Sequence, residues 1–393
     1  MRRHPLAAAL VVLLLVTALR PLPQLVDAVT GAPPGDAVLV KPFWYLVLAP
    51  PSDMLDALTF LSLARAKALL ATWLVVLATV GGLSGESWRG RLTRAVGYPL
   101  VLVLFAAAAV LAPRPVPYLT SSDPDGTIVD FHAHTEASHD GRRGWTVEDL
   151  ARWHAAQGFQ ASYVTDHNVV FNRHVVTPIR LLPGAEWSVF GQHVVALGEV
   201  EPLDPALYSR DTPAMLGIFG GLHALNALGI ASIPEYWENH RDDLGLFVAE
   251  GVDGFEIVNC APKAIGFPTK ARAEVVALAR SHDLLLTGAS DNHGWGKVTC
   301  VWNVSYPESH GYAANHVIAR PLAMAQGESP TWTAAVSQGW LMLRTIDIPE
   351  RISWLTWILL WTIYRDVPRR HGQPGGLGIL ARRLTVAPRE GPR

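Results

Sequence analysis

Side chains that bind metal ions stand two positions apart at two places in the chain. His132 and His134 belong to the segment VDFHAHT, and Asp291 and His293 belong to the segment SDNH. On an extended strand, residues two positions apart point to the same side. Imidazoles and carboxylates gathered on one side are ligands for divalent cations. The spacing therefore predicts metal-binding chemistry.

Further candidate ligands stand at the ends of other predicted strands. His167 lies in TDHN, Glu186 lies in PGAE, and His193 starts the next apolar run. A single histidine is more often a core or surface residue than a ligand, so no one position carries the prediction. Active sites of α/β barrels are built at strand ends. We therefore expect these side chains to gather in one site because they recur together at such positions.

The elements that must position these residues begin at Thr127, where short apolar runs alternate with helical patterns. This alternation is typical of an α/β domain with parallel βα units and suits one barrel-like domain. Thr146 and Asp149 form an approximate capping box for the first helix. Strands are expected at 128–131, 162–165, 186–189, 193–197, 230–233, 254–258 and 284–287, and helices at 147–156, 214–228 and 269–281.

The order of the motifs resembles one known family. DxHxHT at 130–135 is followed by TDHN at 165–168, then by PGxE at 183–186 and by a late SDxH at 290–293. Over about residues 127–300 this order is similar to the polymerase-and-histidinol-phosphatase (PHP) superfamily. The resemblance implies a distorted (βα)7 barrel that holds two or three divalent metal ions at the carboxyl ends of its strands.

The resemblance also assigns ligand roles by position. The first metal would be held by His132, His134, Glu186 and Asp291, with Glu186 bridging to a second metal that His193 also serves. A third metal would be held by His167 and His293, together with the residue that closes the first motif. His139 stands at the usual position for that residue and Asp140 one place beyond; either can ligate, and His139 is favoured.

One departure from the family pattern concerns the second metal. The family usually has a His-Pro pair at the end of one strand, and here Ile233 precedes Pro234. Isoleucine cannot ligate a metal, so Glu235 or His240 would have to replace the histidine, or the second metal is weakly held or absent. Asn259 also matches a familiar family position, where a strand-end amide that bonds the loop is an equal alternative.

Clustered divalent ions suit hydrolysis of a phosphate ester by a metal-activated water. The candidate catalytic residues are Glu186 and Asp291, with His240 or His310 as a general acid. Three cations could bind phosphate or be plain surface charges: Arg142, Arg143 and Lys263. The imidazole-rich ligand set favours zinc, manganese or iron over magnesium or calcium.

The expected substrate is a phosphorylated small molecule, a nucleotide, an oligonucleotide or a lipid-linked phosphate. Two alternatives remain: a non-catalytic metal-binding sensor or structural module, and a metal-dependent hydrolase of C–N or C–O bonds. The net charge of −2 gives no sign of stable nucleic-acid binding.

Composition divides the chain before residue 127. Only 17% of the 393 residues are charged, which indicates a membrane portion. Residues 1–115 contain three apolar runs, at 5–19, 58–83 and 95–112. The first suits a signal peptide or an uncleaved signal anchor, and the second and third are expected to be transmembrane helices; the alternative is three buried helices of a soluble domain. Arg65 and Lys67 near the start of the second run could reach the interface. Residues 116–126 are expected to be a linker that leads into a hydrolase domain at 127–350.

The positive residues predict which side of the membrane the domain occupies. Basic residues precede the first apolar run and lie between the second and third, at Arg89, Arg91 and Arg94. Basic loops stay in the cytoplasm, so the hydrolase domain is expected on the extracytoplasmic side.

The C-terminal region 351–393 combines three tryptophans in ISWLTWILLWTIY with a basic tail. An interfacial helix is the first expectation, a short transmembrane span the second and a buried domain helix the third. The two cysteines, Cys260 and Cys300, are distant in sequence, and their spacing predicts neither a disulfide framework nor a zinc site.

Overall fold

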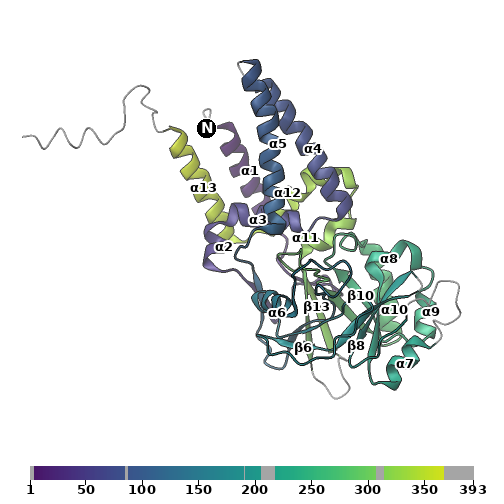
Figure 1. Cartoon of the computed structure of the whole chain (residues 1–393). Helices are drawn as coiled ribbons and strands as arrows, with labels where there is room; N and C mark the ends of the chain where they lie inside the picture. Colours follow the sequence, from purple (N-terminus) through teal and green to yellow (C-terminus); the bar gives the residue numbers. More distant parts are fainter. Residues whose placement is uncertain (1–3, 85–86, 190, 205–216, 307–313, 367–393) are drawn as a thin grey trace, which may run out of the picture.

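The computed structural model describes residues 4–84, 87–189, 191–204, 217–306 and 314–366. A mixed α/β body carries apolar helices that project from one of its sides (Figure 1). The predicted basic tail and the candidate His310 lie outside the described residues.

The helices of the described chain fall into two groups. On the projecting side lie α1 (Pro5–Ala18), α2 (Phe43–Val47), α3 (Ala49–Thr59), α4 (Leu63–Ser84), α5 (Trp88–Leu111), α11 (Pro321–Met324), α12 (Ala334–Thr345) and α13 (Ile348–Asp366). The body contains α6 (Val147–Ala156), α7 (Ile218–Ala224), α8 (Ile233–His240), α9 (Leu244–Ala249) and α10 (Thr269–Ser281). Two single-turn 3-10 helices, η3 (Ala325–Gly327) and η4 (Thr331–Thr333), precede α12.

The strands are β1 (Val26–Asp27), β2 (Ala37–Val40), β3 (Tyr118–Ser121), β4 (Thr127–Asp130), β5 (Ala161–Tyr163), β6 (Arg180–Leu182), β7 (Gly184–Val189), β8 (Gln192–Leu197), β9 (Leu228–Ser232), β10 (Gly254–Asn259), β11 (Leu285–Ala289), β12 (Val301–Tyr306) and β13 (Ala314–Ala319). Among the described residues they form a six-stranded sheet in the order β1-β13-β12-β4-β5-β6, a five-stranded sheet in the order β11-β10-β9-β8-β7, and the pair β2-β3.

The two larger sheets each mix parallel and antiparallel pairs. The pairs β4-β5-β6 and β9-β10-β11 are parallel, as the sequence predicts. The pairs β7-β8, β8-β9, β4-β12 and β12-β13 are antiparallel. The α/β class is therefore correct at a coarse level, whereas a seven-stranded barrel is not confirmed.

Most elements predicted around the site are present. Each of the seven predicted strands overlaps an observed one, and α6 and α10 have the predicted bounds. The Thr146 hydroxyl accepts a hydrogen bond from the Asp149 amide, and the Asp149 carboxylate accepts one from the Thr146 amide, which completes the capping box of α6. Helix α7 ends at Ala224, before the predicted residue 228, because the chain turns at Asn226, which has a φ of 55°. Residues 214–216 of the predicted helix lie outside the described residues.

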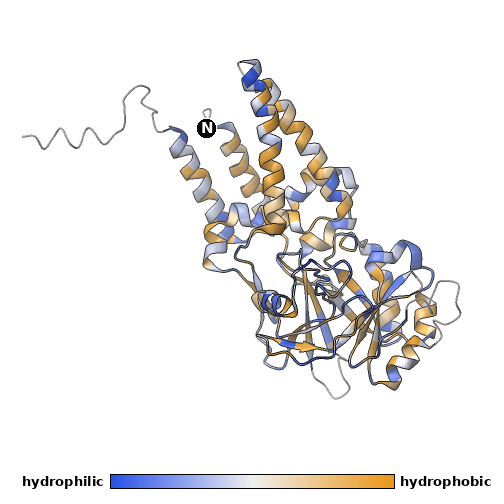
Figure 2. Ribbon diagram, viewed as in Figure 1, coloured by the Kyte–Doolittle hydropathy of each residue, from blue (hydrophilic) through white to orange (hydrophobic). Residues whose placement is uncertain are grey.

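Two helices of the described chain are long and apolar enough to cross a membrane, and both were predicted. Helices α4 and α5 have 22 and 24 residues and pack against each other as a hairpin that extends from the body (Figure 2). A helix of 22 residues is about 33 Å long, which matches the apolar thickness of a bilayer. Helix α1 is shorter, with 14 residues.

The Trp-rich segment forms α13, which has 19 residues. It is not among the helices that are both long and apolar enough to cross a membrane. The helix packs against α1 and α3 and buries Trp354, while Trp357 and Trp361 remain exposed. Within the described chain, α13 thus packs along one side and keeps two tryptophans at the surface.

The N-terminal region also contributes to the body. Strand β1 pairs with β13, and β2 pairs with β3, which lies inside the predicted linker. From α3, Ala57 joins the same apolar core as Val258 of β10. These elements are too short to stand out from the apolar sequence around them, so the composition of residues 1–115 conceals them.

Buried ion pairs fasten the projecting helices to the body. Lys41 Nζ lies 2.6 Å from Glu350 Oε2 of α13. Asp56 of α3 pairs with Arg114, at 3.1 Å, and with Arg320, at 3.4 Å. Removing one partner from a buried pair is costly because the other charge stays buried. These contacts therefore fix the helices in one position on the body.

Arg65 illustrates the same attachment. Its guanidinium was expected to reach the membrane interface, but it is buried and donates to the carbonyl and the hydroxyl of Ser329. Lys67 is exposed, as an interfacial lysine would be.

The two cysteines form a disulfide, which corrects the sequence analysis. Cys260 follows β10 and Cys300 precedes β12, and their Cα atoms are 5.7 Å apart. The pairing was missed because a spacing of 40 residues carries no local signal and only the fold brings these ends together.

Replacing both Cys260 and Cys300 with serine is expected to destabilise the protein by about 2–4 kcal/mol, because the cross-link restricts the unfolded chain. Thermal unfolding of the full-length protein in detergent measures the loss, and reduction of the wild type should reproduce it. Two thiols that alkylate in the unreduced native protein would contradict the pairing.

Candidate metal centre

The ends of strands from both sheets meet at one site. The amide of Asp291, after β11, donates to the carbonyl of His132, after β4, at 2.9 Å. An isolated parallel bridge joins His167, after β5, to Glu186 in β7. These backbone contacts bring the predicted motifs together although they lie up to 160 residues apart.

Four buried side chains point their donor atoms at one another. The Nε2 atoms of His132 and His134 are 3.0 Å apart. Glu186 places Oε1 3.2 Å from His132 Nε2 and Oε2 3.3 Å from His134 Nε2. Asp291 Oδ1 lies 3.1 Å from His134 Nε2. Such spacings suit ligands that share one cation with bonds of about 2.1 Å.

The carboxylate of Glu256 and the carboxamide of Asn259 hold the His132 and Asp291 side chains in place. His132 Nδ1 donates to Glu256 Oε2 at 2.9 Å, which leaves Nε2 with a free lone pair. The amide of Asn259 donates to both Glu256 Oε1 and Asp291 Oδ2. A carboxylate behind a ligating histidine is a usual feature of metal sites. Glu256 was not a candidate in the sequence analysis, because a single acid in a buried strand gives no signal.

The other predicted ligands surround this group. His193 Nδ1 is 2.8 Å and His167 Nδ1 is 2.9 Å from the Glu186 carboxylate. Asp140 reaches His293 Nε2 at 3.1 Å and His167 Nε2 at 3.6 Å. Groups with donor atoms within 4.8 Å of one another are His134/His167/His293, His132/His134/Glu186, His139/Asp140/His167 and His167/Glu186/His193.

The two alternatives at the end of the first motif are placed differently. Both residues are exposed, but Asp140 contacts both His167 and His293, whereas His139 groups only with Asp140 and His167. The geometry therefore directs Asp140 further into the cluster than His139, which was favoured from the sequence.

His240 is not brought to the cluster. Its Nδ1 donates to Asp243 at 2.8 Å, and its Nε2 is 3.0 Å from the carbonyl of Gly191. Both ring nitrogens are engaged, so the position does not suit the general acid or replacement ligand that the sequence suggested.

The second site differs from the family pattern as expected. Ile233 is fully buried at the start of α8. Tyr236 of the same helix places its hydroxyl 3.2 Å from His193 Nε2, and Glu235 pairs with Lys263 at 3.2 Å. Tyr236 was missed because tyrosine has no place in the ligand motifs. Lys263 lies beside the cluster, and Arg142 instead stacks on Trp145.

Two aspartates of the motifs, Asp130 and Asp166, bind the loops around the cluster. Asp130 accepts hydrogen bonds from the amides of His132 and Ser290 and contacts His154 Nε2 at 2.8 Å. Asp166 accepts from the amide and the hydroxyl of Thr135. Both carboxylates therefore hold the metal-site loops rather than face the cluster.

Asp291 itself adopts a conformation that is uncommon for residues other than glycine. Its φ is 45°, in the left-handed region. Such conformations persist where surrounding contacts enforce them. Here the backbone amide of Asp291 donates a hydrogen bond to the His132 carbonyl, and the Asn259 side chain donates one to the Asp291 carboxylate. These two hydrogen bonds keep the carboxylate directed at the imidazoles.

The charges in the cluster keep the carboxyl groups of Glu186 and Asp291 ionised. A proton and a metal ion would compete for the same imidazole nitrogens. Burial opposes ionisation of Glu186 and Asp291, but the neighbouring histidines outweigh it and lower the pKa of both carboxyls. Burial together with the His293 charge lowers the pKa of His134 to about 3. Burial would also lower the pKa of His293, yet its bond to Asp140 and the Asp291 charge raise it to about 9.

Several of these donor atoms have no hydrogen-bond partner of acceptable geometry although they are buried. They are His167 Nδ1, both Glu186 oxygens, Asp291 Oδ1 and His293 Nε2. Buried polar atoms are normally satisfied, and unpaired buried charges are costly. A set of unsatisfied imidazole and carboxylate atoms fits divalent cations, so the residues present suit the metals that the motifs imply.

No protein-family profile and no curated protein matches the sequence. Among solved structures, a Bifidobacterium adolescentis protein provisionally described as a metal-dependent phosphoesterase is 16% identical; 56% of this chain and 97% of that chain align, with a TM-score of 0.34. PsfC from Pseudomonas syringae is 17% identical over 55% of this chain and 97% of PsfC, with a TM-score of 0.39. Likenesses this distant assign neither an activity nor a ligand to the chain.

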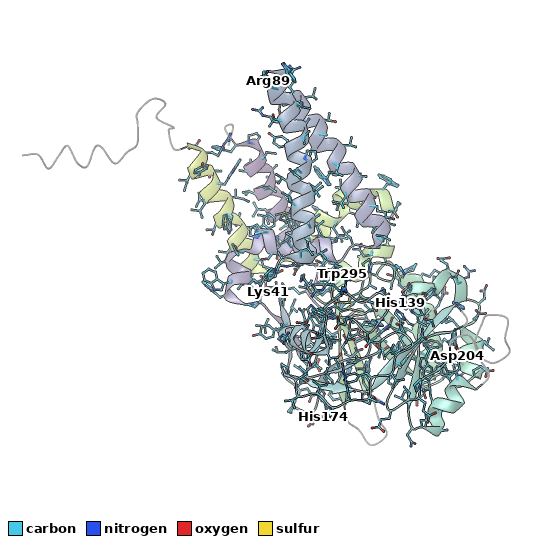
Figure 3. The ribbon with its side chains drawn as sticks, viewed as in Figure 1. Lys41, Arg89, His139, His174, Asp204 and Trp295 are labelled. Carbon is cyan, nitrogen blue, oxygen red and sulfur yellow. A yellow bond between two sulfur atoms is a disulfide. The ribbon has the colours of Figure 1, made fainter. Side chains whose placement is uncertain are left out.

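Metal affinity is expected to rise with pH up to about 9. Below the pKa of His293 a metal must displace the proton from that imidazole, and metal binding releases protons. Equilibrium dialysis of the metal-free protein against zinc at three pH values between about 6.5 and 8.5 tests this. The exposed His174, far from the cluster (Figure 3), gives a control variant, His174→Gln. An affinity that is independent of pH would exclude the site.

Proposed function

We propose that the chain is a membrane-anchored phosphoesterase that depends on divalent metal ions and is related to the PHP superfamily. One observation carries the proposal: buried nitrogen and oxygen atoms of His132, His134, Glu186 and Asp291 converge within about 3.6 Å, and several lack hydrogen bonds. The two sheets would then be halves of a distorted (βα)7 barrel, joined where β4 meets β11 and β5 meets β7.

The remaining ligands extend this arrangement to two or three metals. His193 and Glu186 would share a second ion, and His167, His293 and Asp140 a third, with His139 able to join from the surface. The mixture of imidazoles with few carboxylates favours zinc, manganese or iron.

When bound, the metals would supply an activated water and neutralise charge on the phosphoryl group. The chain's own residues do the rest. Glu186 and Asp291 stay ionised at neutral pH and hold the cations together. Lys263 is exposed beside the cluster, and the bond to Glu235 raises its pKa, so it presents a positive charge to an anionic substrate.

A non-catalytic metal-binding role is the second candidate, and Ile233 favours it. Among the residues that the structure describes, no imidazole replaces Ile233, and Tyr236 contacts His193. A phenol can hold a water or a phosphate oxygen as well as fill space, so the altered second site is compatible with hydrolysis. Turnover measurements separate the two candidates.

For the anchor, we propose that α4 and α5 cross the membrane and that residues 127–350 form the hydrolase domain outside the cytoplasm. Arg89 lies at the tip of the hairpin, farthest from the body (Figure 3), and basic loops stay in the cytoplasm. The disulfide supports the same orientation, because disulfides persist in oxidising compartments. Helices α1 and α13 would lie beside the hairpin in the membrane or at its surface.

Activity is expected from the purified full-length protein loaded with zinc or manganese, on p-nitrophenyl phosphate or its bis ester. His132→Ala should abolish both metal binding and turnover. Glu256→Gln should lower metal affinity or activity roughly 10- to 100-fold, because the native Glu256 carboxylate orients the His132 ring. His174→Gln serves as the control. Bound metal without hydrolysis of either ester would favour the non-catalytic role.

The orientation is tested by a membrane-impermeant maleimide applied to intact spheroplasts. The native cysteines are paired, so a single introduced thiol reports its own side. Val176→Cys, in the body, should be labelled, and Trp88→Cys, at the tip of the hairpin, should react only after lysis. The reverse pattern would place the domain in the cytoplasm.

A further inference from the structure

The cavity above the metal centre has two chemically different walls. Its volume is about 640 Å³. One wall carries the cluster, including Glu186 and Asp291. The rest of the lining includes apolar side chains of the projecting helices and of the turn between α3 and α4, among them Leu61, Leu63 and Val110. These side chains form the apolar wall. A single space therefore joins the polar centre to an apolar surface.

Part of the apolar wall belongs to the two helices that are long and apolar enough to cross a membrane. Leu63 is the first residue of α4, and Val110 is the last but one of α5. Both side chains remain partly exposed, at 47% and 39%. The cavity thus lies at the body end of the hairpin, where an apolar bilayer interior would give way to the polar surface.

Trp295 and Lys263 also line the cavity. Trp295 lines the cavity, is half exposed, and lies where the helices meet the body (Figure 3). Tryptophan is enriched at membrane–water interfaces. Lys263 lies on the polar side with a pKa above its usual range because of Glu235, and it can attract a phosphate. The cavity therefore combines apolar, amphipathic, cationic and candidate metal-binding side chains.

We propose that the site hydrolyses a phosphate ester of a membrane amphiphile. The alkyl chain lies against Leu61, Leu63 and Val110, and the phosphate reaches the metal centre. This inference rests on the proposed function and selects its substrate class. A soluble sugar phosphate or nucleotide would leave the apolar wall in contact with water, whereas an alkyl chain covers it.

The reaction balances with water as the only co-substrate. The oxygen of water forms a bond to phosphorus, and the bond between phosphorus and the ester oxygen breaks. One proton of water passes to the departing alkoxide and gives the lipid alcohol, and the other remains with the phosphate product. No oxidant, reductant or nucleotide is needed.

The test compares ethyl, butyl, hexyl and octyl phosphate on the full-length, metal-loaded protein in detergent. Burial of each methylene favours binding by roughly fourfold at most, so kcat/KM should rise with chain length. The measured quantity is the ratio of kcat/KM for octyl to ethyl phosphate. Comparing proteins under identical conditions cancels the partition of substrate into detergent.

In the variants Leu63→Gln and Val110→Gln, which alter the wall from different helices, that ratio should fall about tenfold, as expected when one to two methylenes lose their apolar contact. The matched control is Leu246→Gln, whose parent side chain is 46% exposed on α9, outside the cavity. The control should keep the wild-type ratio. Metal content and melting temperature establish that each variant is folded.

Two failures are distinguishable. Hydrolysis of aryl and alkyl phosphates with equal kcat/KM at all chain lengths would contradict the proposed amphiphilic substrate and would still support the phosphoesterase activity. A metal-loaded protein that hydrolyses none of these esters would overturn both.

Discussion

The arrangement depends on one constraint, the burial of the Glu186 carboxylate among imidazoles that arrive from three other strand ends. His132, His167 and His193 each place a nitrogen within 3.2 Å of it. A buried anion is tolerated only with compensating charge or coordination. The two sheets must therefore meet at this point, and the Asp291–His132 backbone bond and the strained φ of Asp291 are consequences of that meeting.

A second layer of charge, outside the centre, connects it to the projecting helices. Asp56 holds Arg114 and Arg320, and Lys41 holds Glu350, all with little exposure. The helices and the metal centre are thus parts of one packed unit rather than a domain on a flexible tether. Arg114 follows α5, and Asp56 lies in α3, so these pairs hold the helices next to the cavity in place.

Local patterns in the sequence were sufficient for the parts of the fold that are locally encoded. The capping box at Thr146, the seven strand-forming runs and the paired ligands at 132/134 and 291/293 each depend on residues close together in the chain. The sequence did not predict contacts between distant segments. These are the Cys260–Cys300 disulfide, the hydrogen bond between His132 and Glu256, and the pairing of β1 with β13. The choice between His139 and Asp140 also depends on the loop conformation, which the local sequence does not determine.

The pairing of β1 with β13 has a consequence for biosynthesis. Val26 pairs with Ala319, about 290 residues later, and both hairpin helices are made in between. Contacts of such long range form late and slow folding. If α4 and α5 enter the bilayer while the ribosome is still translating, the sheet is completed on a chain that is already inserted. Membrane insertion would then precede, and spatially confine, the assembly of the candidate metal centre.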